Sequence, residues 1–576
     1  MNKQAILHIP SSNFAHGIDK ERVIFRLRAG RGDLKSCTLF YGDRAYRQNP
    51  VLFTSAEMDV VAQDKYFDYF EICLKSPYTR ICYYFELDDG TERTLYFYDL
   101  FADEIPEDRS ELFQLPFNRV EDIASIPDWV HDAVIYNIFP DSFATGKGYI
   151  SAKESNMKFG DLNCFSKLGG RISGVKENLD YIKELGVNCI YLNPIFAAGE
   201  CHKYDTIDYF SIDPCFGTNE DFKELVDECH KKGIRILIDG VFNHCGWNFF
   251  AFQDVLKNGE NSKYVKWFYE LEFPVVIPDN GDDIPNYSCF AYERKMPKLN
   301  TSNPEVVEYI CKICEFWLKN FNIDGWRLDV ANEIDHDLWR SFRKTAKKAN
   351  PDCFIIGEVW ETAYIWLLGD QFDSAMNYDL RKNCRDFMAL NRLDAYDFDD
   401  RVTAMRMRYM KNLVFGQLNL LDSHDVSRFL SVCGGNIDRF KLAVIFQMTF
   451  IGAPSIFYGD EKGLTGVSER EYRRPMDWGE GNTEIFDFYK ASIALRKNKK
   501  PITRGEFKTI LAEKGSGLYI FKRFLDNQNV IVILNSCEKP ESYNFSEIIS
   551  GMKCEISKGL NDNSIEAFGY AVFSDC

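Results

Sequence analysis

Hydrophobic and polar positions alternate with a period of two over the first part of the chain, up to about residue 121. This period places successive side chains on opposite faces of a strand, so each alternating stretch predicts a half-buried β-strand. Asp-Asp-Gly at 88–90 suits a turn between two such stretches. The stretches are RVIFRLRAG, SCTLFYGD, YFDYFEICLK and RICYYFELDDGTERTLYFYDL. We therefore predict an N-terminal β-sandwich over residues 1–121.

From about Val130 the pattern changes to short apolar stretches that alternate with segments of helical periodicity. Between Val175 and Leu185 the apolar residues recur at helical spacing, and Gly186 suits a C-terminal cap. Eight apolar stretches have the length of strands: AVIYNIFP, NCIYLNP, RILIDGVFN, GWRLDVA, CFIIGEVW, DSAMNY, LNLLDSHD and SIFYGDE. Eight strands with helical crossovers predict a (β/α)8 TIM barrel over residues 128–501.

Two further segments complete the expected α/β architecture. Residues from His244 to about Asn303 separate the third and fourth predicted strands, which is too long for an ordinary loop. We therefore expect an inserted B subdomain at about 244–303. Alternation returns after residue 501, so residues 502–576 are predicted to form a C-terminal β-sandwich.

Charge and hydropathy narrow the classes of partner. The net charge of −18 disfavours binding to nucleic acid or to an anionic membrane. The N-terminus lacks the apolar run of a signal peptide. The longest uncharged run, 442–459, is interrupted by Gln447, Gly452 and Pro454, so it indicates a buried helix followed by a strand. We expect a soluble, cytoplasmic protein that binds neither nucleic acid nor membrane.

Polar residues collect where the predicted barrel strands end, the edge at which barrel active sites lie. In the fourth strand Arg327, Asp329 and Ala331 should share one face, and Trp326, Leu328 and Val330 the other. An arginine and an aspartate inside an apolar strand are costly to bury unless they are paired. The other candidates are Asp239, Asn243, His244, Asn332, Glu333, Glu358, His424, Asp425, His202, Tyr204 and Asp205.

Each of these residues alone has a structural explanation, such as a loop anchor or a satisfied buried histidine. Their convergence on one rim favours an active site instead. The chain has neither a glycine-rich phosphate loop nor a Ser-His-Asp order. Two carboxylates with a third as helper are the groups that glycoside hydrolysis requires.

Four motifs resemble the signature regions of glycoside hydrolase family 13, the α-amylase family. They are DGVFNH (239–244), GWRLDVANE (325–333), IIGEVW (355–360) and LLDSHD (420–425). MPKLN (296–300) and VANE are similar to the neopullulanase, cyclomaltodextrinase and maltogenic amylase subgroup, as are HKYDTIDYFSIDPCFG, DVLKNGENSKY and RRPMDW. The resemblance extends over nearly the whole chain, and the N-terminal sandwich is similar to that subgroup's starch-binding-type N-domain.

The resemblance implies a role for each of three carboxyl groups. Asp329 matches the nucleophile, and Arg327 would keep it ionised. Glu358 matches the general acid/base, for which the pKa is expected to be raised. Asp425 matches the third carboxylate, which would hold hydroxyls of the sugar at subsite −1. The first two carboxyls should lie about 5–5.5 Å apart, the separation of a retaining enzyme.

The resemblance also implies a set of substrate-binding residues. Tyr204 would stack on the −1 sugar, to which His244 and His424 would form hydrogen bonds; Asp239 would support Arg327. Asn332, Glu333, Phe290 and Trp360 would lie on the side of the leaving sugar, although the two aromatic residues could instead pack in the core. His202 and Asp205 complete the predicted substrate-binding set.

The sequence departs from the subgroup pattern in three places. FATGKGYISAKES (143–155) and GGR (169–171) replace the usual calcium loop, so we expect no metal and no cofactor. Glu200 and Cys201 replace the usual Ser-Asn, which bears on endo versus exo action. Glu361 stands where the subgroup often has histidine, which bears on the +1 subsite.

The predicted function is retaining hydrolysis of α-1,4 bonds in cyclodextrins, maltooligosaccharides and pullulan, with some transglycosylation. Within the family, an α-glucosidase or an α-1,6-cleaving enzyme is the alternative. A catalytically silent α-glucan-binding protein is disfavoured because all three carboxylates are present, and a glycosyltransferase is disfavoured by MPKLN and VANE. By resemblance we also expect a homodimer formed through the N-terminal domain.

Overall fold

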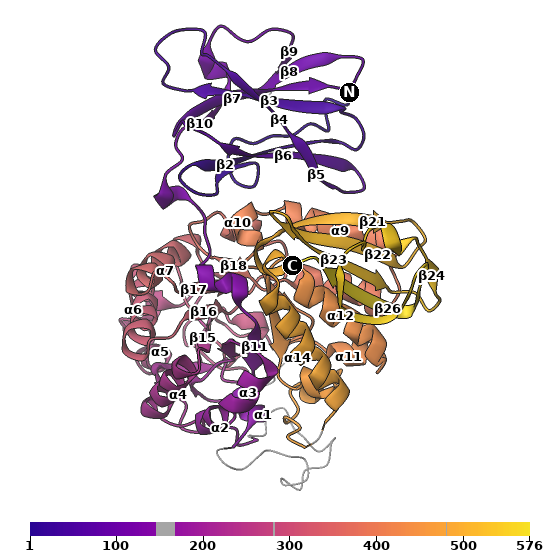
Figure 1. The fold of residues 1–576 in the computed structure, drawn as a ribbon. Helices are drawn as coiled ribbons and strands as arrows, with labels where there is room; N and C mark the ends of the chain where they lie inside the picture. The colour runs from indigo at the N-terminus through magenta and orange to yellow at the C-terminus, as the bar shows by residue number, and fades with distance from the viewer. Residues whose placement is uncertain (99, 146–167, 280–282, 480) are drawn as a thin grey trace.

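The computed structural model describes residues 1–98, 100–145, 168–279, 283–479 and 481–576. Figure 1 shows three parts: an N-terminal β domain above, a central barrel, and a C-terminal sheet at its side. This arrangement confirms the predicted α/β barrel with β domains on both flanks.

The N-terminal domain consists of two facing antiparallel sheets. The first has the order β1 (Ala15–Gly17), β2 (Arg22–Gly30), β6 (Phe67–Lys75), β5 (Asp59–Gln63). The second has the order β4 (Thr54–Glu57), β3 (Ser36–Asp43), β7 (Ile81–Asp88), β8 (Arg93–Phe97), β9 (Leu100–Ala102), with β10 (Phe113–Leu115) on β7. Phe25 and Leu27 of one sheet and Tyr83 and Phe85 of the other are fully buried between them. The predicted sandwich is therefore confirmed.

Eight parallel strands form the barrel. Their order is β18 (Ser374–Ala375), β17 (Phe354–Gly357), β16 (Gly325–Leu328), β15 (Arg235–Gly240), β12 (Cys189–Leu192), β11 (Ile135–Ile138), β20 (Ala453–Phe457), β19 (Leu418–Leu420). A parallel bridge from Met376 to Leu418 joins the two ends of this order and closes the barrel. All eight predicted strands are present, and their ends meet at one rim.

Helices cover the outside of the barrel. They are α1 (Pro140–Phe143), α2 (Ile172–Glu177), α3 (Leu179–Leu185), α4 (Asn219–Lys231), α6 (Pro304–Phe321), α7 (His336–Ala349), α8 (Tyr378–Cys384), α9 (Ala395–Met407), α10 (Lys411–Val414), α11 (Phe429–Val432), α12 (Ile437–Thr449), α13 (Glu469–Tyr472), α14 (Thr483–Asn498) and α15 (Lys500–Arg504). The uncharged run at 442–459 belongs to α12 and β20, as predicted. Across the described residues, none of the helices has the length and apolar character needed to span a bilayer.

One predicted helix is divided in two. The stretch from Val175 to Leu185 forms α2 and α3, because Asn178 leaves the helical conformation at φ −103° and ψ 13°. The Asn178 side chain donates a hydrogen bond to the carbonyl oxygen of Gly174 at 2.8 Å, a competition with backbone bonds that asparagine often provides. Gly186 ends α3 at φ 103°, as expected of a cap.

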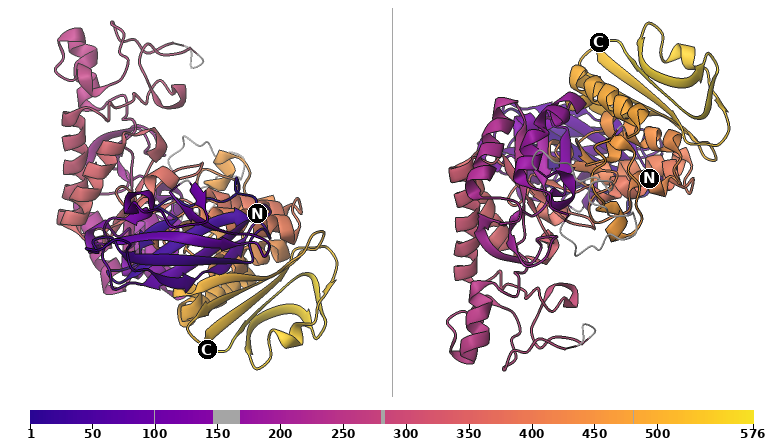
Figure 2. Two further views of the ribbon diagram at one scale, coloured as in Figure 1. Left: turned by 90° about the horizontal axis from the view of Figure 1, so that it is seen from above. Right: turned by 90° about the horizontal axis from the view of Figure 1, so that it is seen from below.

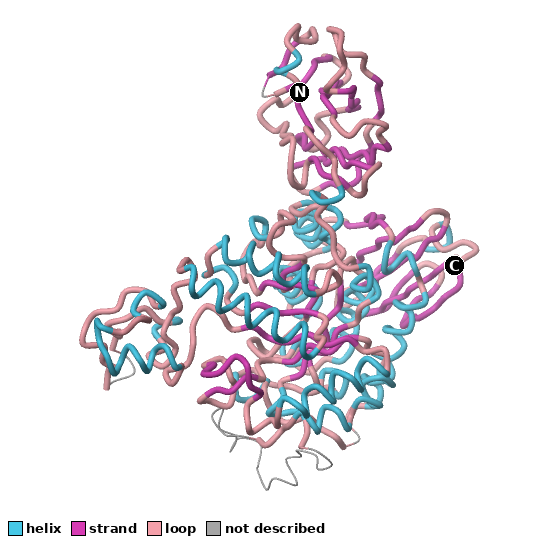
Figure 3. Tube along the Cα trace, turned by 90° about the vertical axis from the view of Figure 1, so that its left-hand side faces the viewer, coloured by secondary structure: helices cyan, strands magenta, loops and turns pink. Residues whose placement is uncertain are grey.

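The segment between β15 and α6 projects away from the barrel, as Figures 2 and 3 show. It contains α5 (Phe250–Asn258) and several short 3-10 turns. A bridge between His244 and Lys298 joins its two ends. A hairpin of β13 (Phe196–Ala198) and β14 (Thr206–Ile212) follows β12 at the same rim. These two insertions bring loop residues to the ends of the barrel strands.

The C-terminal domain is a single sheet, whereas we expected two. The order is β21 (Glu506–Ala512), β22 (Leu518–Leu525), β23 (Gln528–Asn535), β26 (Ser564–Ser574), β24 (Glu541–Ser542), with β25 (Lys553–Asn561) also on β26. Because β26 pairs with β23 and β24 along one edge and with β25 along the other, all strands join one sheet. One face packs on the barrel, where Tyr519 and Phe521 contact Phe446 of α12.

Candidate active site

Arg327 joins the carboxyl groups of three neighbouring strands. It is fully buried, and its Nη1 lies 2.9 Å from Asp239 Oδ1 and 2.8 Å from Asp329 Oδ1. Its Nη2 lies 2.7 Å from Glu358 Oε1. Strands β15, β16 and β17 are adjacent, with Asp239 opposite Arg327 in the register, so these side chains must meet. Three carboxylates thus compensate the positive charge of Arg327, which would be costly to bury alone in the fourth strand.

The fourth strand ends earlier than the alternation predicts. Strand β16 stops at Leu328, and Val330 adopts a left-handed conformation at φ 44°. A β-branched residue in this region is strained, so Val330 and Ala331 do not continue the two faces of the strand. The turn aims the N–H of Val330 at Glu358 Oε2, at 2.9 Å. It therefore helps to hold Glu358 beside Asp329.

Asp329 and Glu358 differ in the donors that they receive. Glu358 accepts hydrogen bonds from Val330 N and from Trp360 Nε1, at 3.2 Å, besides its ion pair with Arg327. Asp329 accepts a hydrogen bond from Arg327. Burial and the negative charge of Glu358 raise the pKa of Asp329, although Arg327 opposes this rise. Loss of the negative charge of Glu358 would therefore favour the ionised form of Asp329.

Asp425 is an ionised carboxylate on the open side of the same cluster. His424 Nε2 lies 3.0 Å from Asp425 Oδ2, and Arg473 Nη2 lies 3.3 Å from Oδ1. Burial works against ionisation, but His424 and Arg473 outweigh it and hold the pKa of Asp425 well below its usual range. The side chain remains 22% exposed and lies 4.0 Å from Arg327 Nη2. It can therefore accept hydrogen bonds from sugar hydroxyls.

Tyr204 and the two histidines form a wall beside the carboxylates. The rings of Tyr204 and His424 are parallel within 9°, and their hydroxyl and Nε2 atoms are hydrogen-bonded. The Tyr204 hydroxyl also donates to Asp239 at 3.2 Å. His244 Nε2 contacts the carbonyl oxygen of Tyr204 at 3.1 Å, and burial lowers the pKa of His244 to about 3. His244 is therefore neutral at physiological pH.

Two aromatic side chains flank this wall. Phe290 stacks on His244 with ring centres 4.9 Å apart and is partly exposed. Trp360 stacks on Tyr378 at 4.0 Å and remains 42% exposed. Both present ring surface near the carboxylates, so neither serves core packing alone.

Asn332 and Glu333 are held by residues from other loops. Asn332 Nδ2 donates to Glu361 Oε1 at 2.9 Å. Glu333 Oε2 forms an ion pair with Lys298 Nζ at 2.9 Å. The carboxylate of Glu361 thus orients the side chain of Asn332.

His202 and Asp205 occupy supporting positions. Tyr204 N donates to His202 Nδ1 at 3.1 Å. Asp205 accepts from the N–H groups of Gly199, at 2.9 Å, and Glu200, at 3.1 Å, and is 5% exposed. The contacts of Asp205 indicate an anchor for the loop that carries Glu200 rather than a hydroxyl acceptor.

Sequence reasoning missed two residues of this cluster. Asn193 follows β12, and its Nδ2 lies 2.9 Å from His424 Nδ1. Arg473 contacts Asp425, and its Nε donates to the carbonyl oxygen of His424 at 2.7 Å. Arg473 lies in the RRPMDW stretch, which could have identified it.

The absence of a bound calcium ion stays a prediction. Most of the expected loop, 146–155, lies outside the described residues. In the part of the chain that the structure describes, no group of three or more His, Cys, Asp or Glu residues is arranged to hold a metal ion.

Comparisons with known proteins agree with this geometry. Residues 137–481 match the model of the alpha amylase catalytic domain, and residues 1–119 match the alpha amylase N-terminal ig-like domain. A cyclomaltodextrinase of Geobacillus thermopakistaniensis (strain MAS1) is 42% identical over 541 residues, which cover 93% of this chain and 91% of that protein. Neopullulanase 2 of Thermoactinomyces vulgaris is 43% identical over 539 residues, which cover 92% and 91%.

A solved cyclomaltodextrinase structure superposes with a TM-score of 0.91 at 37% identity, and the match covers 100% of both chains. The N-terminal domain, the barrel and the C-terminal sheet therefore have counterparts in one known enzyme. The chain is a glycoside hydrolase and belongs to the α-amylase family, glycoside hydrolase family 13.

Proposed function

We propose that this enzyme hydrolyses α-1,4 bonds of cyclodextrins, maltooligosaccharides and pullulan with retention, and also transfers glycosyl groups. The observation that carries the proposal is Arg327, which ion-pairs with Asp329 at 2.8 Å and with Glu358 at 2.7 Å. A shared cation keeps two carboxyls close enough for a retaining pair. The names of the relatives, cyclomaltodextrinase and neopullulanase, support the substrate class.

In the first step, Asp329 attacks the anomeric carbon and forms a covalent glycosyl ester. The bond from that carbon to the glycosidic oxygen breaks, and Glu358 gives its proton to the departing oxygen. In the second step, the Glu358 carboxylate removes a proton from water, whose oxygen attacks the same carbon and releases Asp329. A sugar hydroxyl in place of water gives transglycosylation.

Before the first step, Glu358 must be protonated and Asp329 must be ionised. Without substrate, Glu358 accepts bonds from Val330 and Trp360, whereas the pKa of Asp329 is raised. In the complex with substrate, the glycosidic oxygen can accept a hydrogen bond from the protonated carboxyl of Glu358. Bound substrate therefore gives the proton of the general acid a hydrogen-bond acceptor at the scissile bond.

The −1 sugar would lie against Tyr204 and the Asp425 carboxylate. Asp425, with its lowered pKa, accepts hydroxyl hydrogens without competing for the catalytic proton. On the other side of the scissile bond, Phe290 and Trp360 offer exposed ring faces for a sugar. Asn332 and Glu333 would contact the leaving or accepting sugar.

Product analysis tests this proposal. Wild type is incubated with β-cyclodextrin, maltotriose, panose and pullulan, and the products are separated by chromatography, with Asp329→Asn as the control. We expect opening of β-cyclodextrin, maltose from maltotriose, and loss of all products in the control. Cleavage restricted to α-1,6 bonds of panose would contradict the α-1,4 assignment and favour the alternative family activity.

We further propose a cytoplasmic homodimer formed through the N-terminal domain, acting without a cofactor. Apolar side chains exposed on that domain and its connector support the dimer: Leu52 at 68%, Tyr98 at 61% and Val120 at 64%. A relative is named an intracellular maltogenic amylase. Sedimentation as a monomer at micromolar concentration would contradict the dimer, and loss of activity in chelator would contradict the absence of a metal.

A further inference from the structure

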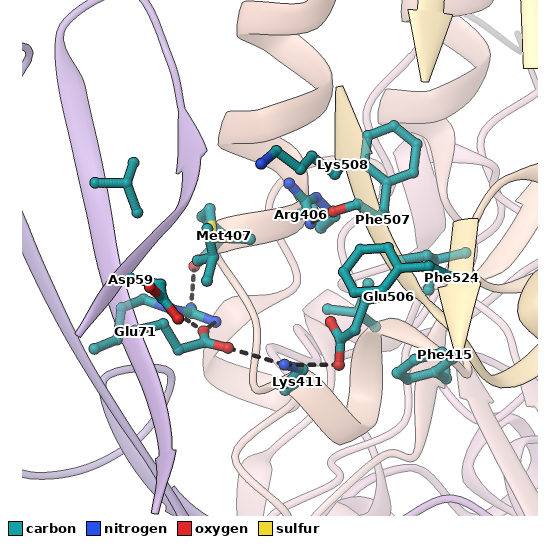
Figure 4. A pocket seen from close by; sticks show the side chains of 15 residues that line it. Asp59, Glu71, Arg406, Met407, Lys411, Phe415, Glu506, Phe507, Lys508 and Phe524 are labelled. Carbon is teal, nitrogen blue, oxygen red and sulfur yellow. Dashed lines mark hydrogen bonds and ion pairs between the residues drawn. The ribbon is translucent and has the colours of Figure 1, made fainter. Parts of the chain in front are cut away.

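Two adjoining cavities lie where the N-terminal domain, the barrel and the C-terminal sheet meet, and Figure 4 shows the larger one. Their volumes are about 390 Å³ and about 350 Å³. Their walls come from β5, α9 and β21, and none of the active-site residues described above lines them. Both are lined by Val60, Val61, Arg406 and Lys508. The two cavities therefore share one wall that carries two cations.

On the side of the larger cavity, the charges compensate one another. Glu71 accepts from Arg26 at 2.7 Å and from Lys411 at 3.0 Å, and Lys411 also pairs with Glu506 at 2.8 Å (Figure 4). Burial would raise the pKa of Glu71, but Arg26 and Lys411 lower it to about 2. This chain of ion pairs links all three domains, and its cations, Arg26 and Lys411, are both paired within it.

Arg406 is a buried cation without a carboxylate partner. It is 8% exposed, its Nη1 donates to the carbonyl oxygen of Phe507 at 3.3 Å, and its Nε has no hydrogen-bond partner. No Asp or Glu of the described residues lies within 4.0 Å of its guanidinium. Buried arginines are nearly always paired, because an uncompensated charge is costly to desolvate.

Two carboxylates that line the smaller cavity have other partners. Asp399 accepts from the hydroxyls of Thr509, at 2.6 Å, and Tyr519, at 2.8 Å, and burial raises its pKa. Asp400 accepts from the N–H of Lys65 at 2.7 Å. Lys508 Nζ forms neither a hydrogen bond nor an ion pair with any described residue, and it lines both cavities together with Arg406. Neither Arg406 nor Lys508 therefore forms an ion pair with a described carboxylate, although Asp399 and Glu506 lie near enough to act on the charge of Arg406.

We propose that this double cavity binds a phosphate group, either free or carried by a small sugar phosphate, through Arg406 and Lys508. Two cations match a dianionic phosphate better than a single carboxylate, and a guanidinium has the planar donor geometry that phosphate prefers. The volume exceeds that of a phosphate ion, and Val61 and Phe507 supply apolar surface for the remainder of a ligand. Because the walls come from three domains, the bound anion would stabilise their packing.

Calorimetry and thermal unfolding of the full-length enzyme test this site, with inorganic phosphate, glucose 1-phosphate, acetate and glucose as probes. We expect phosphate or glucose 1-phosphate to bind with a Kd of about 1 mM or tighter and to raise Tm, whereas acetate and glucose should not. Binding of phosphate alone indicates a site for the free ion, and tighter binding of glucose 1-phosphate indicates a site for the ester; both support the proposal.

Variants separate this site from the rest of the molecule. Lys508→Met and Arg406→Met should each weaken binding at least about tenfold, and the exposed Lys508 keeps the test informative if the arginine variant does not fold. Lys514→Met, in the turn between β21 and β22 and outside the cavities, should bind as wild type does. Failure of wild type to bind either phosphate compound, or unchanged binding in Lys508→Met, would overturn the proposal.

Discussion

Replacing Glu358 by glutamine should shift the ionisation of Asp329 in a direction that the structure fixes. The negative charge of Glu358 raises the pKa of Asp329, and the reaction needs Asp329 ionised. Removing that charge favours the ionised form, so the acid limb of the rate profile moves to lower pH. For two carboxylates about 5 Å apart at an effective dielectric constant of about 20, the interaction is about 3 kcal/mol, or about two pKa units.

The assay must not depend on proton donation by Glu358. Maltosyl fluoride meets this need, because fluoride leaves without a proton, and its release can be followed in the first turnover over a range of pH. The control is Glu361→Gln, which removes a carboxylate that contacts Asn332 instead of Arg327 and should leave the acid limb unchanged. An acid limb that stays in place in Glu358→Gln would refute the coupling between the two carboxyls.

Three further predictions follow from named contacts. Arg327→Met leaves Asp239, Asp329 and Glu358 without their cation, so urea denaturation at neutral pH should show a loss of about 3–5 kcal/mol; an unchanged midpoint would contradict this role. Trp360→Ala removes an exposed ring beside Glu358, so the ratio of transfer to hydrolysis products from maltotriose should fall, and an unchanged ratio would remove Trp360 from the acceptor side. Burial lowers the pKa of His8 to about 3, so the stability that neutral His8 contributes is complete above its unfolded pKa and is lost as pH falls toward 3. Between pH 6.5 and 4 the loss in the free energy of unfolding is about 3 kcal/mol. In His8→Gln the pH dependence of urea unfolding should flatten by that amount, and an unchanged pH dependence would contradict this role.

The barrel was predictable because its strands are short, mostly apolar and separated by helical periods. Interruptions of local regularity were not predictable. Asn178 divides one helix through a side-chain bond to Gly174, and Val330 ends the fourth strand in a left-handed turn. Both depend on conformations that the hydrophobic pattern does not record. The pairing of β26 on both edges, which makes the C-terminal domain one sheet, also depends on partners distant in sequence.

Much of the candidate site was predictable as a set of residues, because Arg327, Asp329, Glu358 and Asp425 lie in or just after barrel strands whose ends share one rim. The contacts among them were less accessible. Arg473 reaches Asp425 from a segment beyond the last barrel strand, and Asn193 reaches His424 across the barrel. Asp205 stood in a motif of substrate-binding residues, but its carboxylate holds the backbone of Gly199 and Glu200. A motif locates a residue at the site, whereas hydrogen bonds decide whether it faces the substrate.

Asp329 should carry the sugar between the two steps of the reaction. Glu358→Gln lacks the base for the second step, so incubation with a maltosyl fluoride should trap the ester, and mass spectrometry of proteolytic peptides should locate the added sugar. We predict a peptide containing residues 325–333 with the mass of one maltosyl group added, and fragmentation that assigns it to Asp329. A sugar attached to Asp425 or Asp239, or rapid product formation with no labelled peptide, would contradict the role of Asp329 as the nucleophile.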